Sequence, residues 1–242
     1  MLEGGHGPNA PDEIVLHRDG SGAITGAVYF GTQLVIAADT AAVNAFAAEL
    51  RRHPRLRSFV GPKACIDRLW EQVRSWHRAP VLARANQPIY ALVPAALVGG
   101  ADLDVRQATL ADAESVIENS AEMMLGELGY DPRVNRVSFG TGVRRAISSG
   151  QWWVYIEGGE LRFQLNVGAR TKATAQLQGV WTPPALRKRG YASAALAQIA
   201  ARLLLVHPTV SLYVNDFNRD AIALYERVGF VCVGEMSTLL FE

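Results

Sequence analysis

The sequence has few of the residues that build metal sites or disulfide frameworks. Its two cysteines, Cys65 and Cys232, lie far apart and have no clustered cysteine or histidine partners. This pattern excludes a disulfide framework and a zinc site of the usual spacing. Both residues are therefore interpreted as buried, small apolar side chains, with a reactive thiol as the alternative.

Net charge and long apolar runs are also lacking. The formal net charge is +1, which gives no broad electrostatic field to attract nucleic acid or a membrane surface. No stretch approaches the roughly 20 apolar residues of a membrane helix, and the N-terminus has no signal-like apolar run. We therefore expect a cytoplasmic protein without nucleic-acid or membrane partners.

The remaining composition is ordinary for a globular protein. The chain has 242 residues, of which 49% are hydrophobic and 19% charged. This length lies between one large domain and two small ones. Residues 1–12, rich in glycine and proline, are expected to be a flexible tail in which His6 is a surface residue.

An α+β domain is predicted over residues 13–100. Two β-rich runs separated by Gly31 indicate a hairpin, and Asp39 or Thr40 can cap the helix that follows. A short strand, RSFVGP, a second helix and the strand QPIYALVPAAL come next. The two helices have apolar faces at helical spacing, which we interpret as core. These faces comprise Val43, Phe46, Ala47, Leu50, Ile66, Leu69, Trp70 and Val73.

A second domain is predicted over residues 104–242, after a boundary at Gly99 and Gly100. A strand leads into a helix that Gly129 ends, and a further helix is expected over about 134–148. Strands, a helix, a strand, a helix and terminal strands follow. Both halves place a hairpin before a helix, so a repeated fold is possible although no sequence repeat is visible. The apolar residues of the first helix are Val116, Ile117, Ala121 and Leu125.

The most informative segment is the loop after the strand that ends near Trp181. Pro183 stops that strand, and an amphipathic helix then begins. Unpaired backbone N–H groups and the positive end of the helix dipole lie there beside three cationic side chains. We interpret the loop as an anion site suited to a pyrophosphate, where Gly190 permits close approach and Ala192 is small. The loop residues are Arg187, Lys188, Arg189 and Gly190.

Two motifs resemble signatures of the GNAT (general-control-type N-acetyltransferase) superfamily. The pattern Arg187-x-x-Gly190-x-Ala192 is similar to the acyl-CoA pyrophosphate loop of that family. About twenty-five residues later, the spacing N-x-x-A-x-x-x-Y-x-x-x-G-F resembles the second signature. It is formed by Asn218, Ala221, Tyr225, Gly229 and Phe230. The resemblance covers roughly residues 105–242.

Tyr225 is the residue for which the resemblance implies catalysis. A phenol, with an ordinary pKa of about 10, stays protonated at neutral pH and can protonate the thiolate that thioester aminolysis expels. Without the motif, Tyr225 would be interpreted as a helix tyrosine packed on the sheet. Asn218 keeps two open roles, a helix cap or, by the resemblance, a hydrogen bond to the CoA arm.

The resemblance also implies a splayed strand end at Val180 to Thr182, whose backbone binds pantetheine like an added strand. The Val180 N–H would hold the developing oxyanion, and Trp181 would be a packing residue beside that slot. The CoA-binding residues implied in this way are Val180, Trp181, Thr182, Arg187, Lys188, Arg189, Gly190, Tyr191, Ala192, Ser193 and Asn218.

The general base is left open between several carboxylates and a water chain to bulk solvent. The carboxylate candidates are Glu122, Glu127, Glu157 and Asp216. Glu122 and Glu127 are favoured, because the helix-to-loop segment that holds them often walls the acceptor site in GNAT folds.

The whole chain also resembles actinobacterial proteins that join a divergent N-terminal domain to a GNAT domain. The shared-looking segments are RSFVGP, the DRLW helix, QGVW, LYVNDFN and TLLF. The N-terminal half has no basic glycine loop and no N-x-x-A-x-x-x-Y helix. If that half is a degenerate GNAT-like module, its CoA site has been lost.

We therefore expect an α/β (α+β) protein with a GNAT-type mixed, largely antiparallel sheet flanked by helices, preceded by a smaller α+β domain. The expected activity is transfer of an acetyl group from acetyl-CoA to a primary amine of a small molecule or a protein, without a metal. The alternatives are a noncatalytic acyl-CoA-binding sensor and a structural pairing module. A monomer or a homodimer is expected.

Overall fold

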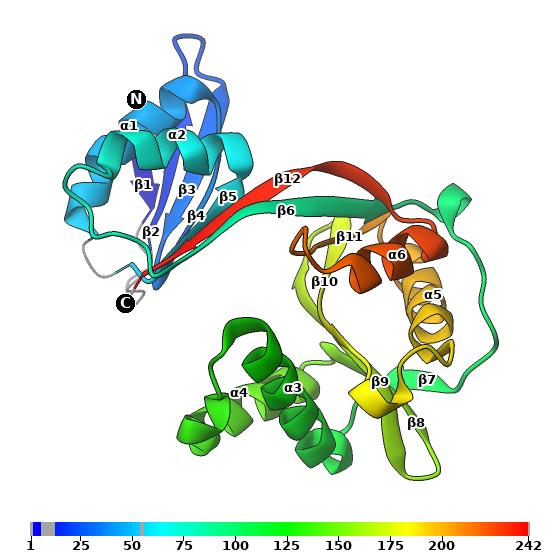
Figure 1. Ribbon diagram of the computed structural model, residues 1–242. Coiled ribbons are helices and arrows are strands. Elements are labelled where there is room, and N and C mark those ends of the chain that lie inside the picture. Colours follow the sequence, from blue (N-terminus) through cyan, green and yellow to red (C-terminus); the bar gives the residue numbers. More distant parts are fainter. Residues whose placement is uncertain (1, 6–12, 54–55, 242) are drawn as a thin grey trace. The chain divides into compact units, whose positions relative to one another are not determined.

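The computed structural model describes residues 2–5, 13–53 and 56–241, which form two compact units (Figure 1). Unit 1 comprises the described residues of 1–89, 214–217 and 234–242, and unit 2 comprises 90–213 and 218–233. The chain thus leaves unit 1, forms most of unit 2, and returns twice to complete unit 1.

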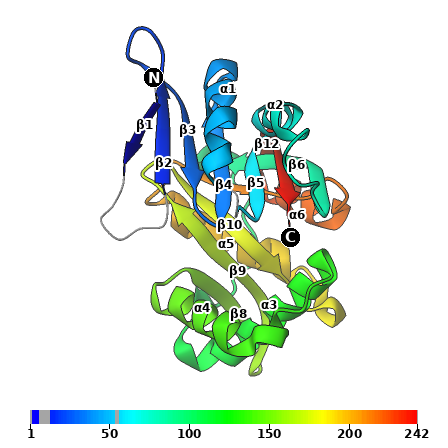
Figure 2. The same cartoon turned by 90° about the vertical axis from the view of Figure 1, so that its left-hand side faces the viewer.

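Unit 1 is built on a sheet with the strand order β1-β2-β3-β4-β5-β12. The pair β4 and β5 is parallel, and the other neighbours are antiparallel. Figure 2 shows β1 to β4 side by side. The elements are β1 (Leu2–Gly5), β2 (Glu13–Arg18), β3 (Ile24–Phe30), β4 (Gln33–Ala38), α1 (Thr40–Glu49), η1 (Leu50–Arg52), β5 (Ser58–Pro62), α2 (Lys63–Val73), β6 (Leu82–Leu92) and β12 (Val231–Leu240), the last two of which also hold residues of unit 2.

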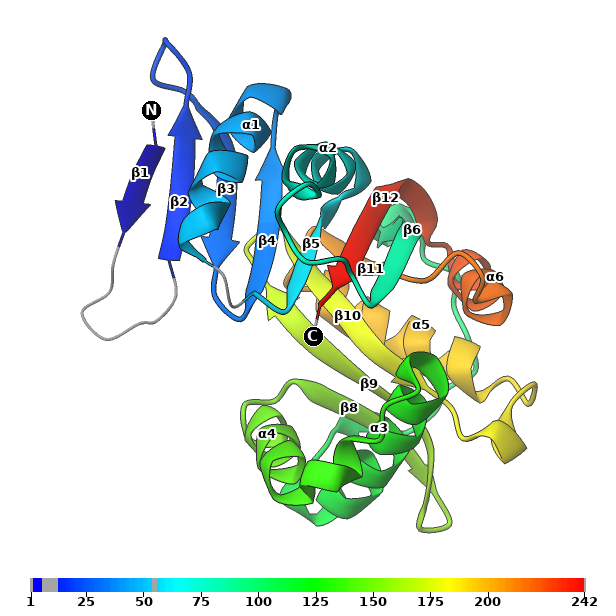
Figure 3. The same ribbon diagram turned by 60° about the vertical axis from the view of Figure 1, so that its left-hand side comes forward.

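The local sequence explains the elements of unit 1. The Gly31 N–H donates to the Gln33 carbonyl oxygen at 3.1 Å, which closes the predicted hairpin between β3 and β4. Asp39 caps α1, and its carboxylate accepts the Ala42 N–H at 2.8 Å. Buried and more exposed residues alternate along β3 and β4, so the core lies on one face of these strands, against α1 and α2 (Figure 3).

The predicted core faces of α1 and α2 are confirmed, with one difference. Seven of the eight residues are buried, whereas Trp70 is only partly buried at the margin of the core. Cys65 is buried as expected, and its Sγ donates to the Ala38 carbonyl oxygen at 3.1 Å. The expectation for Cys232 is wrong, because this residue lies in the exposed first part of β12.

Part of the expected N-terminal tail belongs to the sheet. Leu2–Gly5 form β1, which pairs with β2 in a register that sets Leu2 opposite His17. The remainder of the tail prediction, including His6, lies outside the described residues. Pairing with β2 satisfies backbone N–H and C=O groups of this segment. The glycine-rich sequence of the segment did not predict a strand.

Unit 2 is built on a sheet with the strand order β11-β10-β9-β8-β7, in which only the pair β10 and β11 is parallel. The expected mixed, largely antiparallel sheet with flanking helices is thus confirmed. The elements are η2 (Pro94–Ala96), β7 (Val105–Gln107), η3 (Leu110–Asp112), α3 (Ala113–Leu128), η4 (Pro132–Asn135), α4 (Arg136–Ser148), β8 (Trp152–Glu157), β9 (Glu160–Arg170), β10 (Thr174–Trp181), η5 (Pro184–Leu186), α5 (Tyr191–Leu204), β11 (Thr209–Tyr213) and α6 (Arg219–Val228).

Helices cover both faces of the unit 2 sheet. The neighbours Gln164 and Leu165 in β9 point to opposite faces, and both are 0% exposed. The Gln164 side chain contacts Ser120 of α3, so α3 and α4 cover one face, whereas α5 and α6 cover the other (Figure 3). This double cover distinguishes β9 from the alternating strands of unit 1.

Capping residues fix both ends of α3. Thr109 and Asp112 form a capping box at the start of η3, which leads directly into α3, and two nitrogens of Arg106 donate to the Asp112 carboxylate at 2.7 and 2.9 Å. This arginine lowers the pKa of Asp112 to about 2. Gly129, with φ of 66°, ends the helix as predicted. Leu125 is 42% exposed and does not belong to the core, because α3 extends beyond the core at this end and residues 125–127 are all exposed.

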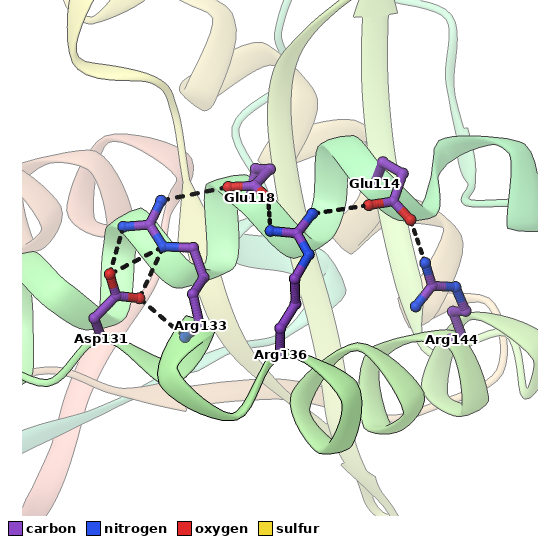
Figure 4. Close-up of polar contacts among 6 residues, drawn as sticks. All are labelled: Glu114, Glu118, Asp131, Arg133, Arg136 and Arg144. Carbon is purple, nitrogen blue, oxygen red and sulfur yellow. Dashed lines mark hydrogen bonds and ion pairs between the residues drawn. The ribbon is translucent and has the colours of Figure 1, made fainter.

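A chain of ion pairs joins α3 to the segment of η4 and α4 (Figure 4). Arg136 donates to Glu118 at 2.6 Å and to Glu114 at 3.3 Å, and Arg144 also pairs with Glu114. Arg133 bridges Asp131 and Glu118. A network in which Glu114 and Glu118 of α3 each meet two arginines holds the two helices together more firmly than isolated surface pairs would.

Candidate functional site

The strands β10 and β11 part at the end of their ladder. Their parallel pairing runs only from Thr174 opposite Thr209 to Gln176 opposite Ser211, although β10 continues to Trp181 and β11 to Tyr213. Backbone N–H and C=O groups on this edge of β10 are therefore not paired with β11. An extended ligand that carries amides can pair with such an edge as an added strand.

A bulge lies in β10 at the place where the strands part. Gln178 pairs with Asn166 and Trp181 with Gln164, so β10 uses one more residue than β9 over this interval. Gly179 has φ of 61°, a conformation that favours glycine. The bulge re-aims the backbone groups of 179 and 180, and the Val180 N–H is the group for which the sequence predicted an oxyanion contact.

The predicted anion loop joins this strand end to α5. Lys188 and Gly190 both have positive φ, of 62° and 86°, and Gly190 is the N-cap of α5. No side chain within the described residues caps the helix start. Lys188, Arg189 and Gly190 are exposed. Positive charge, the helix dipole and uncapped N–H groups thus occur together, which is the arrangement that binds phosphate groups.

Arg187 is held against the strand end. Its Nε donates to the Thr182 carbonyl oxygen at 3.1 Å, and its Cζ lies 4.5 Å from the centroid of the Trp181 ring. The sequence assigned Arg187 to the anion and Trp181 to packing without relating the two. In the structure the guanidinium fixes the conformation between β10 and the loop, and its other nitrogens remain the donors that a phosphate could use.

The first turn of α5 also has contacts of its own. The Tyr191 hydroxyl donates to the Glu157 carboxylate at 3.3 Å, and the Ser193 hydroxyl donates to the Gly190 carbonyl oxygen at 3.0 Å. Ala192 is partly buried. Tyr191 and Ser193 therefore shape the helix start through their side chains, so contact with an anion would be made chiefly by backbone N–H groups of this turn.

Tyr225 lies in the interior of unit 2 on α6. It is 6% exposed, and its ring lies 6.2 Å from Tyr90 and 6.0 Å from Phe230, measured between centroids. Burial raises the pKa of Tyr225 well above its ordinary value, and the Glu127 carboxylate raises it further. The hydroxyl is therefore protonated at neutral pH, as a general acid for a thiolate must be.

Asn218 is confirmed as the cap of α6. Its side-chain oxygen accepts the Ala221 N–H at 3.3 Å, and Gly229, with φ of 103°, ends the helix. The cap uses one acceptor of the Asn218 amide, so the second predicted role, a hydrogen bond to the CoA arm, would fall to its NH₂ group.

The four carboxylates named as candidate bases lie in different surroundings. Glu157 accepts hydrogen bonds from Tyr155 at 2.8 Å and from Tyr191, so its oxygens are already engaged. Asp216 belongs to unit 1. Glu122 and Glu127 are exposed residues of α3, and Glu127 alone of the four acts electrostatically on Tyr225.

Sequence reasoning missed a row of amide side chains beside the bulge, which we call the amide row. Gln178 donates to Asn166 at 3.0 Å, and Gln164 donates to Ser120 of α3 at 3.0 Å. Among the described residues, Oε1 of Gln164, Nε1 of Trp181 and Oγ1 of Thr182 are buried without a partner. Alternating polar residues in QLNVG and QLQGV were a signal, because polar side chains on a strand face covered by α3 require a partner.

Over the described ranges, no cluster of three or more histidine, cysteine, aspartate or glutamate residues could hold a metal ion. Within the same ranges, no helix has the length and apolar character to cross a membrane.

Two family models match the chain. Residues 142–230 match the acetyltransferase (GNAT) family, and residues 15–116 match a domain of unknown function, DUF4081. The predicted fusion of a divergent N-terminal domain with a GNAT domain is thereby confirmed. None of the curated proteins matches this chain.

Solved structures share the fold over nearly the whole chain. A GNAT acetyltransferase from Colwellia psychrerythraea aligns with a TM-score of 0.62 at 11% identity, covering 95% of this chain and 85% of the other. A GCN5-related N-acetyltransferase from Sphaerobacter thermophilus gives 0.57 at 16% identity, covering 93% and 79%. A tandem GNAT protein from the clavulanic acid biosynthesis pathway gives 0.52 at 12% identity, covering 96% and 84%.

These comparisons and the geometry agree on the C-terminal part of the chain. The matched residues 142–230 contain β10, the glycine loop, α5 and α6. Residues 142–230 are similar to the GNAT acetyltransferase family, and this match and the fold together support an acyltransferase role.

Proposed function

We propose that the protein is an N-acetyltransferase that moves an acetyl group from acetyl-CoA to a primary amine. One observation carries the proposal: the parted edge of β10, its bulge and the uncapped start of α5 follow one another along a single strand, loop and helix. Such an order offers a strand edge that is not paired with β11 to an amide-bearing arm, and a phosphate site at the far end of that edge, and CoA has both an amide-bearing arm and a pyrophosphate.

Donor binding divides between backbone and side chains. The pyrophosphate is bound by the first N–H groups of α5, from Tyr191 to Ser193, and by the cations Lys188 and Arg189. Arg187, which is held by Thr182 and Trp181, is the third cation. Residues 180–182 pair with the pantetheine arm along the free edge of β10. The close approach depends on Gly190, where an added Cβ would meet no other atom within 4 Å but the backbone has φ of 86°.

The reaction needs a neutral amine nitrogen. Its lone pair attacks the thioester carbonyl carbon, which forms a C–N bond and a tetrahedral intermediate whose oxyanion accepts the Val180 N–H. Collapse breaks the C–S bond, and the Tyr225 hydroxyl gives its proton to the leaving sulfur. The amine loses a proton to a base, and the tyrosinate is reprotonated from solvent before the next turnover. The net products are the N-acetylated amine and CoA.

Glu127 is the carboxylate we favour as the base. It lies on α3, which covers the sheet face opposite α5, and its charge reaches Tyr225. A donor that enters at α5 leaves the α3 face of the bulge for the acceptor. Glu122 lies on the same helix and is the next choice, and a water chain could replace either carboxylate.

For the acceptor, we propose only that it carries a primary amine. A small molecule or a protein can supply the primary amine, and the protein acts as a monomer or homodimer in the cytoplasm. The N-terminal domain has a substrate-gating or a packing role.

A panel of amines tests the proposal. Free CoA release is measured with acetyl-, propionyl- and succinyl-CoA as donors and small amines, amino acids, aminoglycosides and lysine peptides as acceptors. Steady release above the hydrolysis blank with acetyl-CoA supports the enzyme. If acetyl-CoA binds but no acceptor gives turnover, the protein is a binding module. If acetyl-CoA does not bind, the donor site itself is refuted.

A further inference from the structure

Unit 1 contains a hollow of about 350 Å³ beyond the C-terminal ends of α1 and α2. We call it the Arg51 hollow. A volume of this size lies at the small end of the range for ligand pockets, about 300 to 1,000 Å³. It therefore suits a small molecule rather than a dinucleotide or CoA. Its lining residues are Leu50, Arg51, Trp76, His77 and Arg78.

The lining of the Arg51 hollow combines apolar and aromatic surfaces. Leu50 is buried in the core of unit 1. The His77 ring packs between Phe59 and Phe241, at centroid distances of 5.0 and 4.6 Å. Trp76 is partly buried beside it. These contacts hold the aromatic lining in place, so a planar ligand would meet a preformed surface.

Two guanidinium groups complete the lining, and both are positioned by other contacts. Arg51 lies over the Trp76 ring, with its Cζ 4.2 Å from the ring centroid. Arg78 donates from Nη2 to the Leu56 carbonyl oxygen at 2.6 Å. A guanidinium that is already held loses little side-chain entropy when it binds a ligand.

The positive charge of these two arginines is not neutralised within the described part of the chain. Neither Arg51 nor Arg78 has a carboxylate partner there, whereas the adjacent Arg52 pairs with Glu49 at 2.9 Å. The C-terminal ends of two helices supply roughly half a negative charge each. Two full positive charges therefore leave an excess of about one positive charge at the hollow.

Stabilisation of helix ends does not account for both arginines. A cation that serves a helix end lies near its last carbonyl groups. Arg78 instead donates to Leu56, which follows η1 and precedes β5, and Arg51 stacks on an aromatic ring. Both guanidinium groups therefore contact residues at the hollow and not the last carbonyl groups of a helix.

We propose that the Arg51 hollow binds a small organic anion that has a planar apolar body and a carboxylate or phosphate group. The anionic group would accept hydrogen bonds from Arg51 and Arg78, and the planar body would lie along Trp76 and His77. The pairing of guanidinium forks with such groups is both strong and directional. Unit 1 would then be a ligand-binding module, with a site separate from the acetyl-CoA site proposed for unit 2.

Titration of the full-length protein with three matched probes tests this proposal. Benzoate and phenyl phosphate carry the anionic group, and benzyl alcohol is a neutral compound of the same shape. Calorimetry or ligand-observed NMR should show saturable binding of at least one anion and at least about tenfold weaker binding of the alcohol. The stronger of the two anions identifies the anionic group. No saturable binding of either anion up to about 10 mM, or equal binding of the alcohol, overturns the proposal.

Variants locate the bound anion. Arg51→Ala and Arg78→Lys should each weaken anion binding at least about tenfold, because each loses a charge-assisted, fork-shaped contact. The matched controls are Arg52→Ala and Arg74→Ala, which remove neighbouring exposed arginines outside the lining and should leave affinity within about twofold. Unchanged affinity in Arg51→Ala contradicts the site. Competition between acetyl-CoA and the anion would place the anion in unit 2 and would also overturn it, whether or not the protein acetylates amines.

Discussion

The segments β4-α1-β5 of unit 1 and β10-α5-β11 of unit 2 have the same topology. In each, the last strand of an antiparallel meander is followed by a helix, a strand parallel to it and a second helix. The predicted possibility of a repeated fold without repeated residues agrees with this match. Among the described residues, only the segment in unit 2 has the features of the proposed CoA site, so the shared topology alone does not predict one.

The two helices begin in opposite chemical ways. The first N–H groups of α1 face the Asp39 carboxylate, which accepts from Ala42, whereas α5 starts at an uncapped, positive-φ Gly190 after three cationic residues. A carboxylate at a helix start occupies the position that favours an anion and repels a second one. Asp39 therefore stabilises α1 and removes the helix start as a phosphate site.

The strands β4 and β10, which precede the two helices, also differ between the two units. The register of β4 with β3 is regular, whereas that of β10 with β9 has two shifts. A Cβ added at Gly61 of β5 would lie 2.5 Å from the Ile36 carbonyl oxygen of β4, so those two strands stay close together. β10 and β11 part after Gln176. We propose that the bulge and the uncapped helix form the donor site in unit 2, and that the cap of α1 and the close approach of β4 and β5 prevent such a site in unit 1.

The largest effect is expected at the start of α5. Gly190→Glu should lower acetyl-CoA affinity at least about a hundredfold, because it brings a negative charge to the phosphate site. Calorimetry measures the affinity, and circular dichroism checks the fold. Gly190→Ala is the matched control: it carries the same backbone strain of about 1–2 kcal/mol without charge and should keep binding within about tenfold. Near-normal affinity in Gly190→Glu would remove the pyrophosphate assignment.

The next largest effect is expected on the rate of acetyl transfer, without a change in CoA affinity. Tyr225→Phe should keep the fold and the CoA affinity, because the ring still packs between Tyr90 and Phe230. Loss of the acidic proton should lower the single-turnover rate of CoA formation by about 10²- to 10⁴-fold, and at least about tenfold if water substitutes in part. Single-turnover measurement avoids masking by slow product release. An unchanged rate would return Tyr225 to a structural role.

A third effect is a pH dependence in the folding of unit 2. The pKa of Asp112 is lowered from 3.8 to about 2, so its interaction with Arg106 stabilises the fold above about pH 4 and is lost as the pH falls towards 2. Asp112→Asn should lower the free energy of unfolding at pH 7 by about 1–2 kcal/mol, discounted for the partly exposed arginine. Urea titrations should show this difference shrinking between about pH 5 and pH 3. A difference that stays constant over this range would contradict the ion-pair explanation.

The smallest effect sharpens the contrast between the two helix starts. Asp39→Ala should lower the free energy of unfolding by about 1 kcal/mol through loss of the α1 cap. It should not create a second acetyl-CoA site, because β4 lacks a bulge and β5 stays close to it. Urea unfolding and CoA titration measure the two outcomes. A new CoA site in this variant would show that Asp39 alone blocks unit 1.

Features that depend on neighbouring residues were predictable from the sequence. The Asp39 cap, the Asn218 cap and the glycine ends of α3 and α6 each depend on a few adjacent side chains and on φ. The helix faces followed from the spacing of apolar residues. The anion loop could be predicted for the same reason, because Gly190 and the cationic residues 187–189 are adjacent in the chain.

Features that join distant segments were not predictable in this way. The closing strand β12 pairs Thr238 with Val60, so unit 1 includes the C-terminal end of the chain. The stacking of Arg187 on Trp181 and the contact of Gln164 with Ser120 depend on how a strand meets a loop or a helix. Local periodicity carries no information on such pairings, which is why the amide row was missed.

The stoichiometry of acetyl-CoA binding tests the central claim most directly. Calorimetric titration of the full-length protein should give one site per chain, because among the described residues only β10-α5-β11 joins a bulged strand to an uncapped helix start that follows three cationic residues. Two equivalent sites, or one site that Gly190→Glu leaves intact, would contradict the contrast between β4-α1-β5 and β10-α5-β11.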